Sequence, residues 1–488
     1  MFSKIPKLVI EILKKLEENN FEAYIVGGCV RDLLMNREPK DWDITTNAKP
    51  EEIMKIFPDS FYKNKFFTVG VKTNEEKIPV IEVTTFRIEQ KYSDKRHPDE
   101  IKFAKTLEED LSRRDFTINA IAMKLANNKR IKANESNYEI IDLYDGRKDI
   151  KNKIIRAVGN PTDRFSEDAL RMMRAVRFAS ELDFIIEEKT FEAIKKNAKN
   201  LDYISQERIK DELNKIILSD KPAEGIDMLY ETGLLNYVIS ELEKGVGVKQ
   251  NRHHIYTIYK HSIMSLKFCP SKKLSVRLAT LLHDIAKPQT KRGEGLYATF
   301  YNHDHIGAKV AENILKRLRY QNEIIAKVKL LVDNHMFYYN PDEVGESSVR
   351  KLIRKVGLEN MKDLIELRMA ERLGSGVPKA KPYKLRHLEY IIEKVSHDAI
   401  SVKMLKINGN DLMQILKTKP GPKIGAILDV LLSEAIEDPE KNNKEYLSKR
   451  ALELSKENLD TLRKLAKEKI EEKKEEEDRE IKKKHWVK

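Results

Sequence analysis

Two closely spaced carboxylates, Asp41 and Asp43, are the first residues whose types and spacing could do chemistry. They stand in the segment DWDITT, about a dozen residues after the glycine pair Gly27 and Gly28. Residues two apart in a strand lie on one face, so both side chains are expected to point the same way. Two adjacent carboxylates repel each other unless a divalent cation lies between them, and Mg²⁺ takes one or two carboxylates together with substrate phosphates. The pair predicts a Mg²⁺-dependent, two-metal phosphoryl-transfer site with both aspartates as catalytic ligands.

The segments around this pair contain residues that could bind the phosphates of a substrate. FEAYIV has the pattern of a short buried strand, GG that of a turn, and CVRDLLM that of a helix start. Gly27 and Gly28 would let the backbone approach phosphates, and Arg31 lies one helical turn in, placed to contact them. Glu82, in the alternating segment PVIEVTT, is a candidate third acid, and a solvent-facing strand residue explains it equally well. An Asp-x-Asp pair alone would favour an exposed loop, but the upstream glycine turn reverses that preference.

The combination GG-x-VRD with Asp-x-Asp resembles the DNA polymerase β-like nucleotidyltransferase superfamily. Later motifs resemble its branch of bacterial and eukaryotic tRNA nucleotidyltransferases and bacterial poly(A) polymerases. The likeness spans roughly residues 21–215 with specific motifs and continues more loosely to about 450. It implies an α/β head in which a 3′-hydroxyl attacks the α-phosphate of a nucleoside triphosphate.

The segment LSRRDFTINAIAM resembles the ribose-selecting motif of that family. The resemblance assigns sugar selection to Arg114 and Asp115, with Arg113 adjacent. A group that hydrogen-bonds the 2′-hydroxyl rejects deoxyribonucleotides because it is left unpaired when the hydroxyl is missing. The plain alternative is a surface cluster of ion pairs.

The segment FSEDALRMMRAVRFA matches the base-recognition helix of the same family. Its spacing predicts one continuous helix on which Asp168, Arg171, Arg174 and Arg177 form a stripe. Cytosine and adenine share an amino donor beside an unprotonated ring nitrogen, whereas uracil and guanine reverse that pair. A carboxylate accepts and a guanidinium donates, so Asp168 with Arg171 can pair with C and A and reject U and G. Arg174 and Arg177 then hold phosphate or restrain Asp168, unless this is simply a basic amphipathic helix with internal ion pairs.

Three further segments resemble supporting parts of these enzymes. IDLYDGRKDI resembles a linking motif, in which Asp142 and Asp149 are hinge and capping groups. SQERIKDEL resembles a neck element, in which Glu207 and Arg208 stabilise the base-reading helix. RIEQKYSDKRHPDEIKF resembles a flexible loop that helps such enzymes change from C to A addition.

Histidines and an aspartate in the later chain resemble an HD metal-dependent phosphohydrolase domain. They occur in HSIMSL at His261, in LLHDIAKP at His283 and Asp284, and in NHDHIGA at His303. The resemblance implies a second divalent metal on His261, His283 and Asp284. The last Asp of the pattern would fall in MAERLGSG, where Glu371 stands instead. Two interpretations stay open: a domain kept for packing and tRNA contact, or an active phosphohydrolase.

These motifs divide the chain into an α+β arrangement, a polymerase β-like head followed by all-α parts. We expect, in order, the head, a helical neck carrying the base-recognition helix, an HD-like body, a tRNA-binding helical tail and a charged C-terminus. Their ranges are 1–155, 156–245, 246–400, 401–455 and 456–488. In the tail, KPGPKIGAIL predicts a tight turn before a capped helix. The stretch KEKIEEKKEEEDREIKKK mixes charges at helical spacing, which favours a solvated helix or frayed end without chemistry.

Composition agrees with a nucleic-acid enzyme of the cytoplasm. The 488 residues carry a net charge of +13, which favours a polyanionic partner, although a basic excess without a ligand is as good an explanation of charge alone. The two cysteines, Cys29 and Cys269, lie far apart, which argues against disulfides and a cysteine zinc site and fits a reducing compartment. The N-terminal segment has its apolar run broken by charges, so it predicts an amphipathic helix and no membrane span.

The sequence therefore predicts addition of C, C and A to the 3′ end of tRNA from CTP and ATP. An A-adding enzyme or a poly(A) polymerase is the alternative within the same fold. An RNA-binding phosphohydrolase with an inactive head is the alternative of another class. The oligomeric state stays open.

Overall fold

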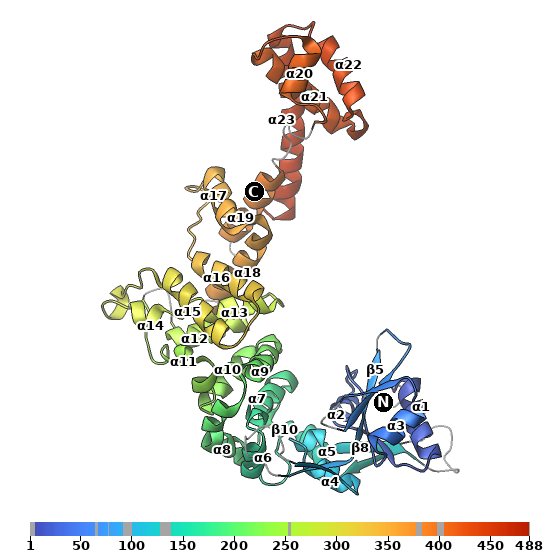
Figure 1. Ribbon diagram of the computed structural model, residues 1–488. Coiled ribbons are helices and arrows are strands. Elements are labelled where there is room, and N and C mark those ends of the chain that lie inside the picture. The colour runs from blue at the N-terminus through green and yellow to red at the C-terminus, as the bar shows by residue number, and fades with distance from the viewer. Residues whose placement is uncertain are drawn as a thin grey trace. The chain divides into compact units, whose positions relative to one another are not determined.

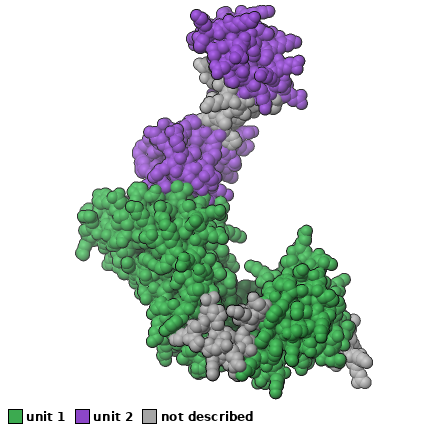
Figure 2. Space-filling model, viewed as in Figure 1, with its two compact units in different colours: residues 1–333, 370–376 green, residues 334–369, 377–488 purple. Residues whose placement is uncertain are grey.

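Figure 1 shows the computed structural model, and the chain divides into two compact units, coloured separately in Figure 2. The first contains residues 1–333 and 370–376, and the second contains 334–369 and 377–488. The structure describes residues 5–63, 67–76, 78–90, 100–126, 138–251, 255–376, 383–397 and 405–487. An α/β head is followed by helices, which confirms the predicted fold class.

The head is built on a seven-stranded sheet in the order β3-β4-β5-β2-β1-β8-β9. Strands β2 and β5 are parallel with Asp43 beside Glu82, whereas the other neighbours are antiparallel. The strands are β1 Ala23–Val26, β2 Asp43–Thr46, β3 Ser60–Tyr62, β4 Thr68–Lys72, β5 Val80–Thr85, β8 Ile121–Leu125 and β9 Tyr138–Asp142.

Helices cover both faces of this sheet. The head helices are α1 Lys7–Glu18, α2 Gly28–Leu34, α3 Pro50–Ile56, α4 Leu107–Ser112 and α5 Gly146–Asn152, with a 3₁₀ turn η2 at Thr117–Asn119. Apolar residues of α1, α2 and α3 pack with Ile44 and Val83 on one face. On the other face, Leu107 and Leu111 of α4 pack with Val26 and Ala122. Because residues alternate along β2 and β5, Asp43 and Glu82 lie on the face that α4 covers.

Strands β6 (Arg87–Gln90) and β7 (Glu100–Phe103) pair antiparallel beside the sheet. They are the two flanks of the segment predicted to be a flexible loop. Its centre, residues 91–99, lies outside the described residues.

The neck corrects one prediction, because the expected continuous base-recognition helix is two helices. Helix α6 (Pro161–Glu167) ends before Asp168, and α7 (Leu170–Leu182) begins after it. Asp168 has an extended backbone (φ −131°, ψ 105°), and its side chain accepts a hydrogen bond from the Leu170 amide at 3.0 Å. This bond offers the chain an alternative to helical pairing, which explains the break.

The rest of the first unit is helical apart from two short strands, β10 (Ile154–Ile155) and β11 (Ile185–Ile186), that pair in parallel. Its helices are α8 Glu188–Asn197, α9 Gln206–Leu218, α10 Pro222–Glu231, α11 Leu235–Glu243, α12 Ile258–Lys267, α13 Leu274–Leu282, α14 Lys287–Thr290, α15 His303–Arg317 and α16 Asn322–Asn334.

The second unit is helical and ends in a docked C-terminus. Its helices are α17 Glu346–Val356, α18 Leu358–Gly374, whose last turn belongs to the first unit, α19 Tyr383–His397, α20 Gly409–Leu416, α21 Pro422–Glu437, α22 Lys444–Leu454 and α23 Leu459–Lys484. Ile481 and Val487 pack with Tyr390 of α19. His485 Nε2 lies 2.6 Å from a Glu393 carboxylate oxygen. Of the two forms expected for this charged stretch, a helix or a frayed end, the structure shows the helix α23, and apolar and ionic contacts hold the residues at its end against α19.

Among the described residues, no helix combines the length and the apolar character needed to cross a membrane.

Candidate active site

Three acids lie close together at the start of β2, on the inner strands of the head sheet. Asp43 is the first residue of β2, Asp41 is exposed two residues before it, and Glu82 is the register partner of Asp43 on the parallel strand β5. Lys63 forms an ion pair with Glu82. Burial raises the pKa of Asp43 to about 6, helped by the charges of Glu82 and Asp41 and opposed mainly by Arg114. A site that disfavours its own negative charge in this way suits a divalent cation.

The glycine turn leaves room for a close approach beside these acids. Gly27 has φ +86°, and a Cβ there would lie 3.0 Å from Arg114 Nη1 and 4.0 Å from Asp43 Oδ2. A Cβ on Gly28 would lie 3.7 Å from Arg31 Nη2. Gly27 therefore lies beside an arginine and a carboxylate, and Gly28 lies beside Arg31.

Arg31 faces from the head toward the neck. Its Nη1 donates to Asn119 Oδ1 at 2.8 Å, and its Nη2 pairs with Asp32 at 2.7 Å. Its guanidinium also lies over the ring of Phe178 on α7, 5.2 Å from the centroid.

The arginine pair of the ribose motif is anchored by Asp110, a residue that the motif analysis missed. Asp110 is fully buried on α4 and pairs with Arg113 at 2.8 Å and Arg114 at 3.4 Å. Its Oδ2 also accepts from the hydroxyl of Thr45 on β2 at 3.3 Å. Burial opposes ionisation, but Arg113 and Arg114 outweigh it and lower the pKa of Asp110. Its spacing of three and four residues before the arginines was the available signal.

Asp115 is held on both carboxylate oxygens. Oδ2 accepts from Arg174 Nε at 2.8 Å, and Oδ1 accepts from Asn119 Nδ2 at 3.2 Å and from the Phe116 amide at 2.9 Å. Burial would raise the pKa of Asp115, but the charge and hydrogen bond of Arg174 hold it at about 2. Asp115 is therefore an ionised acceptor at neutral pH.

The two predicted base-reading residues have separate partners. Asp168 Oδ2 accepts from Arg208 Nη2 at 2.9 Å, which is a contact that the supporting role predicted for Arg208 would need. Arg171 Nη1 donates to Glu167 at 2.7 Å, and its Nη2 donates to the Arg113 carbonyl at 3.0 Å. The ion pair with Glu167 was not predicted. It ties α7 to the preceding helix.

Three guanidinium groups gather around Phe178, a residue that the sequence analysis did not single out. Arg177 lies 4.1 Å, Arg31 5.2 Å and Arg174 5.3 Å from its ring centroid. Arg177 also pairs with Glu212 of α9 at 3.2 Å, and burial lowers the pKa of Arg177. Arg174 thus holds Asp115, and Arg177 holds Glu212. Asp168 is restrained by Arg208 instead.

The linking motif has the predicted capping role. Asp142 accepts from the backbone amides of Gly146 at 2.7 Å and Arg147 at 2.8 Å at the start of α5. Asp149 accepts from the Thr117 hydroxyl at 2.7 Å. These bonds fasten α5 to η2, next to the ribose motif.

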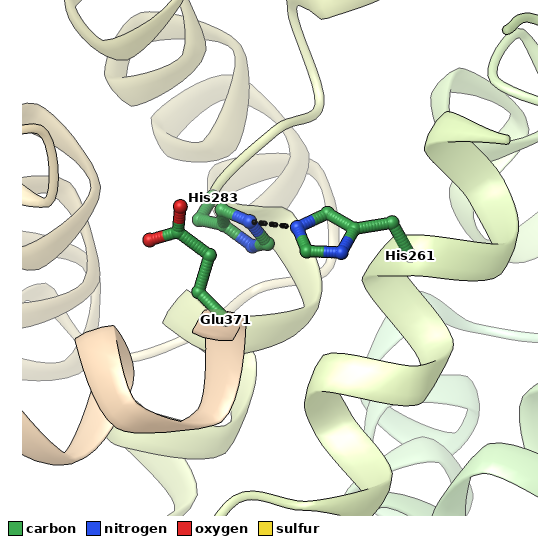
Figure 3. A group of neighbouring side chains, drawn as sticks. All are labelled: His261, His283 and Glu371. Carbon is green, nitrogen blue, oxygen red and sulfur yellow. Dashed lines mark hydrogen bonds between the residues drawn. The ribbon is translucent and has the colours of Figure 1, made fainter. Parts of the chain in front are cut away.

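A second cluster lies in the helical part of the first unit (Figure 3). His261 of α12, His283 directly after α13 and Glu371 of α18 each offer a ligand atom, all within 4.8 Å of one another. The Nε2 atoms of His261 and His283 are 3.2 Å apart, and both histidines are fully buried. The structure therefore brings Glu371 beside the two histidines, although it lies far from both of them in the sequence.

Hydrogen bonds orient both imidazoles toward one point. His261 Nδ1 lies 3.2 Å from the Gly374 carbonyl, and His283 Nδ1 lies 2.8 Å from the Thr280 carbonyl. A carbonyl only accepts, so Nδ1 carries the proton and Nε2 offers a lone pair when the ring is neutral. Burial lowers the pKa of His261 to about 4, whereas the charge and hydrogen bond of Asp284 outweigh burial and raise that of His283.

Asp284 is shared between histidines and a lysine. Its Oδ2 lies 3.2 Å from His283 Nε2 and 2.8 Å from Lys287 Nζ, and its Oδ1 lies 3.4 Å from His303 Nε2. Burial disfavours ionisation, but His283 and Lys287 outweigh it and hold the pKa of Asp284 well below its usual range. Lys287 also donates to Gln250 at 2.9 Å.

Comparisons with known proteins agree with the motifs. Residues 23–156 match the poly A polymerase head domain, 183–245 match a probable RNA and SrmB-binding site of polymerase A, and 289–451 match a putative tRNA nucleotidyltransferase domain 2. The CCA-adding enzyme of Ligilactobacillus salivarius is 36% identical over 460 residues, which cover 93% of this chain and 98% of that enzyme.

Solved structures show the same fold. The Bacillus stearothermophilus CCA-adding enzyme in complex with CTP is 28% identical, with a TM-score of 0.58 over 92% of this chain and 96% of that chain. The Thermotoga maritima CCA-adding enzyme complexed with tRNA is similar in fold at 20% identity, with a TM-score of 0.51 over 91% of this chain and 94% of that chain. With a curated relative matched over nearly its whole length, this chain belongs to the family of CCA-adding enzymes.

Proposed function

We propose that this chain adds C, C and A to the 3′ end of tRNA from CTP and ATP, without a nucleic-acid template, and releases pyrophosphate. One observation carries the proposal. Arg31 beside the glycine turn is connected through Asn119 and Asp115 to Arg174 on the helix expected to read the base. Phosphate, sugar and base recognition thereby converge in one unit, as a nucleotidyltransferase requires.

Asp41 and Asp43 would hold Mg²⁺, and the acid cluster with the raised pKa of Asp43 fits such an ion. Bound Mg²⁺ lowers the pKa of the attacking 3′-hydroxyl and neutralises charge on the triphosphate. Arg31 contacts the phosphates, and the open turn at Gly28 lets the backbone approach them.

Sugar and base selection follow from the donors and acceptors of the chain. Asp115, ionised and held by Arg174, accepts from the ribose hydroxyl, and Arg114 donates beside it. Asp168 accepts from the amino group that C and A share, and Arg171 donates to the adjacent ring nitrogen. Arg208 and Glu167 hold these two side chains in place from outside the base.

The test uses tRNA transcripts that end at the discriminator base, at C and at CC, supplied with labelled CTP, ATP or both. Growth of all three to CCA and no further supports the proposal. If only the CC-ended transcript accepts a single A, the chain is an A-adding enzyme. An unbounded A ladder on varied RNAs would instead identify a poly(A) polymerase.

For the HD-like cluster we propose a second divalent metal bound by His261, His283 and Asp284. The carboxylate of Glu371 is a fourth possible ligand. The support is that two imidazole lone pairs and a carboxylate oxygen point to one place. Their near-complete burial favours a packing role, because a catalytic metal keeps an open position.

This second site is tested by metal content and thermal unfolding after dialysis against Mn²⁺ or Zn²⁺, with His283→Ala as the comparison. We expect one extra equivalent of metal and a raised Tm in the parent chain only. Hydrolysis of bis-p-nitrophenyl phosphate by the parent but not by the variant would favour the phosphohydrolase interpretation.

The predicted domain boundaries and the cytoplasmic location remain proposals. The matched ranges 23–156 and 183–245 support boundaries near 155 and 245. The buried thiols of Cys29 and Cys269 fit a reducing compartment.

A further inference from the structure

The side-chain amide of Asn119 joins Arg31, which is proposed to contact the phosphates, to Asp115, which is proposed to select the sugar. Its Oδ1 accepts from Arg31 Nη1 at 2.8 Å, and its Nδ2 donates to Asp115 Oδ1 at 3.2 Å. A guanidinium only donates and an ionised carboxylate only accepts, so the amide has one orientation that satisfies both. Asn119 is 6% exposed, which shields both bonds from water.

The backbone around Asn119 is fastened from several directions. The Asn119 amide donates to the Phe116 carbonyl at 2.9 Å within η2. The Gly27 amide donates to the Ile121 carbonyl at 3.2 Å, which ties the glycine turn to the chain just after η2. Thr117 is anchored by Asp149 at 2.7 Å. The amide therefore sits on a rigid support rather than on a loose loop.

We propose that Asn119 is a positioning residue for sugar selection, which holds the ribose-reading carboxylate of Asp115 at a set separation from the phosphate-side guanidinium of Arg31. The inference rests on the proposed function of Asp115. Among side chains of this length, an amide alone offers a donor and an acceptor in one plane. Aspartate in its place keeps the acceptor for Arg31 but loses the donor to Asp115 and adds a second negative charge beside it.

The arrangement predicts which selectivity changes and which does not. Without the Asn119 donor, one oxygen of Asp115 loses a side-chain partner while Arg174 still draws the other oxygen toward α7. The Phe116 amide still holds Oδ1, so the carboxylate turns about that bond toward Arg174 and away from the position that reads the 2′-hydroxyl. Base reading should be unaffected, because Asp168 and Arg171 are held by Arg208 and Glu167.

The experiment compares Asn119→Asp, a nearly isosteric change, with the parent enzyme on a tRNA that ends at the discriminator base. We expect the kcat/KM ratio of CTP over dCTP to fall about 10-fold or more, since a site that hydrogen-bonds a hydroxyl owes its selectivity to that bond. The KM for CTP should rise, and the CTP over UTP ratio should stay within about 2-fold. Asn119→Ser, which is too short to reach both partners, should change the sugar ratio in the same direction even if the aspartate variant folds poorly.

Two controls separate the possible failures. Asn200→Asp changes another buried asparagine, on the 3₁₀ turn Ala198–Tyr203, and should leave the sugar ratio unchanged. Asp115→Ala should abolish the preference for CTP over dCTP. If Asp115→Ala loses it but both Asn119 variants keep it, the inference about Asn119 is wrong. If Asp115→Ala also keeps it, the assigned role of Asp115 is wrong as well.

Discussion

The ionised form of Asp43 is needed to bind metal, but its burial makes that form destabilising, and a single substitution can test this. Burial raises its pKa from the ordinary 3.8 to about 6, so in metal-free protein at neutral pH its negative charge is held at a cost. The stability that protonated Asp43 contributes is fully present below pH 3.8 and is lost as the pH rises through about 6.

Asp43→Asn, which mimics the protonated acid, should therefore abolish nucleotide incorporation yet stabilise the head without metal. We expect the free energy of unfolding in EDTA at pH 7.5 to rise by about 1 kcal/mol, discounted for partial exposure. Thermal and urea unfolding at pH 7.5 and pH 3.5 would measure it, and the gain should disappear at the lower pH. Near-normal incorporation by this variant and by Asp41→Ala would contradict the metal assignment.

Phe178 offers a second residue-scale test, because Arg31, Arg174 and Arg177 all lie around its ring. A cation–π contact contributes about 0.5 kcal/mol when exposed and about 2 kcal/mol when desolvated, so Phe178→Leu should raise the KM for CTP and ATP about 2- to 30-fold. Steady-state kinetics measures this change. Phe184→Leu removes another buried ring just after α7 and controls for lost packing, so equal effects in both variants would exclude a specific role for the ring.

At the scale of elements, the break between α6 and α7 turns Asp168 toward α9. Arg208 of α9 pairs with Asp168 at 2.9 Å, so discrimination between bases depends on a neighbouring helix. The break also means that Asp168 is oriented by its bond to the Leu170 amide and not by helical geometry.

Asp168→Ala should relax discrimination against UTP about 10-fold or more, and Arg208→Ala should relax it partly, because the carboxylate remains but loses its orientation. Competition between CTP and UTP on tRNA measures both effects. Lys210→Ala, on the same helix, serves as the control. Unchanged rejection of UTP in the Asp168 variant would refute amino-acid reading of the base.

At the scale of the whole molecule, the C-terminal residues belong to the second unit. Tyr390 packs with Ile481 and Val487, and Lys394 lies 3.5 Å from Asp478. The charge-rich sequence around them carries few apolar residues, and two of these, Ile481 and Val487, are buried against α19, whereas Trp486 is exposed.

Removing residues 478–488 should leave the head intact and loosen α19. Losing two buried aliphatic side chains costs about 3–6 kcal/mol at full burial, so we expect faster amide exchange across residues 383–397. Hydrogen exchange followed by mass spectrometry measures this change, with peptides of the head sheet as the internal control. Unchanged protection of α19 would mean that the docked end contributes nothing to the second unit.

Local patterns in the sequence were enough to predict which residues carry the chemistry. Asp41 and Asp43, the glycine turn and the arginine–aspartate motifs are recognisable because their members lie a few residues apart, where strand and helix periods fix their relation. The same holds for the class of fold, since the strands are confined to the head and to one short pair after it. The prediction of one continuous helix through Asp168, made from spacing alone, was wrong because the Asp168 side chain bonds to the Leu170 amide and interrupts the helix.

The tertiary structure alone decided which partners hold those residues. Arg31 and Asn119 are 88 residues apart, and Asp168 and Arg208 are 40 apart. Glu82 joins the aspartates only through the parallel register of β5 with β2, and Glu371 joins His261 only because the last turn of α18, within the first unit, lies against α12. Such pairs form when distant segments bury their surfaces together, and no local period encodes that outcome.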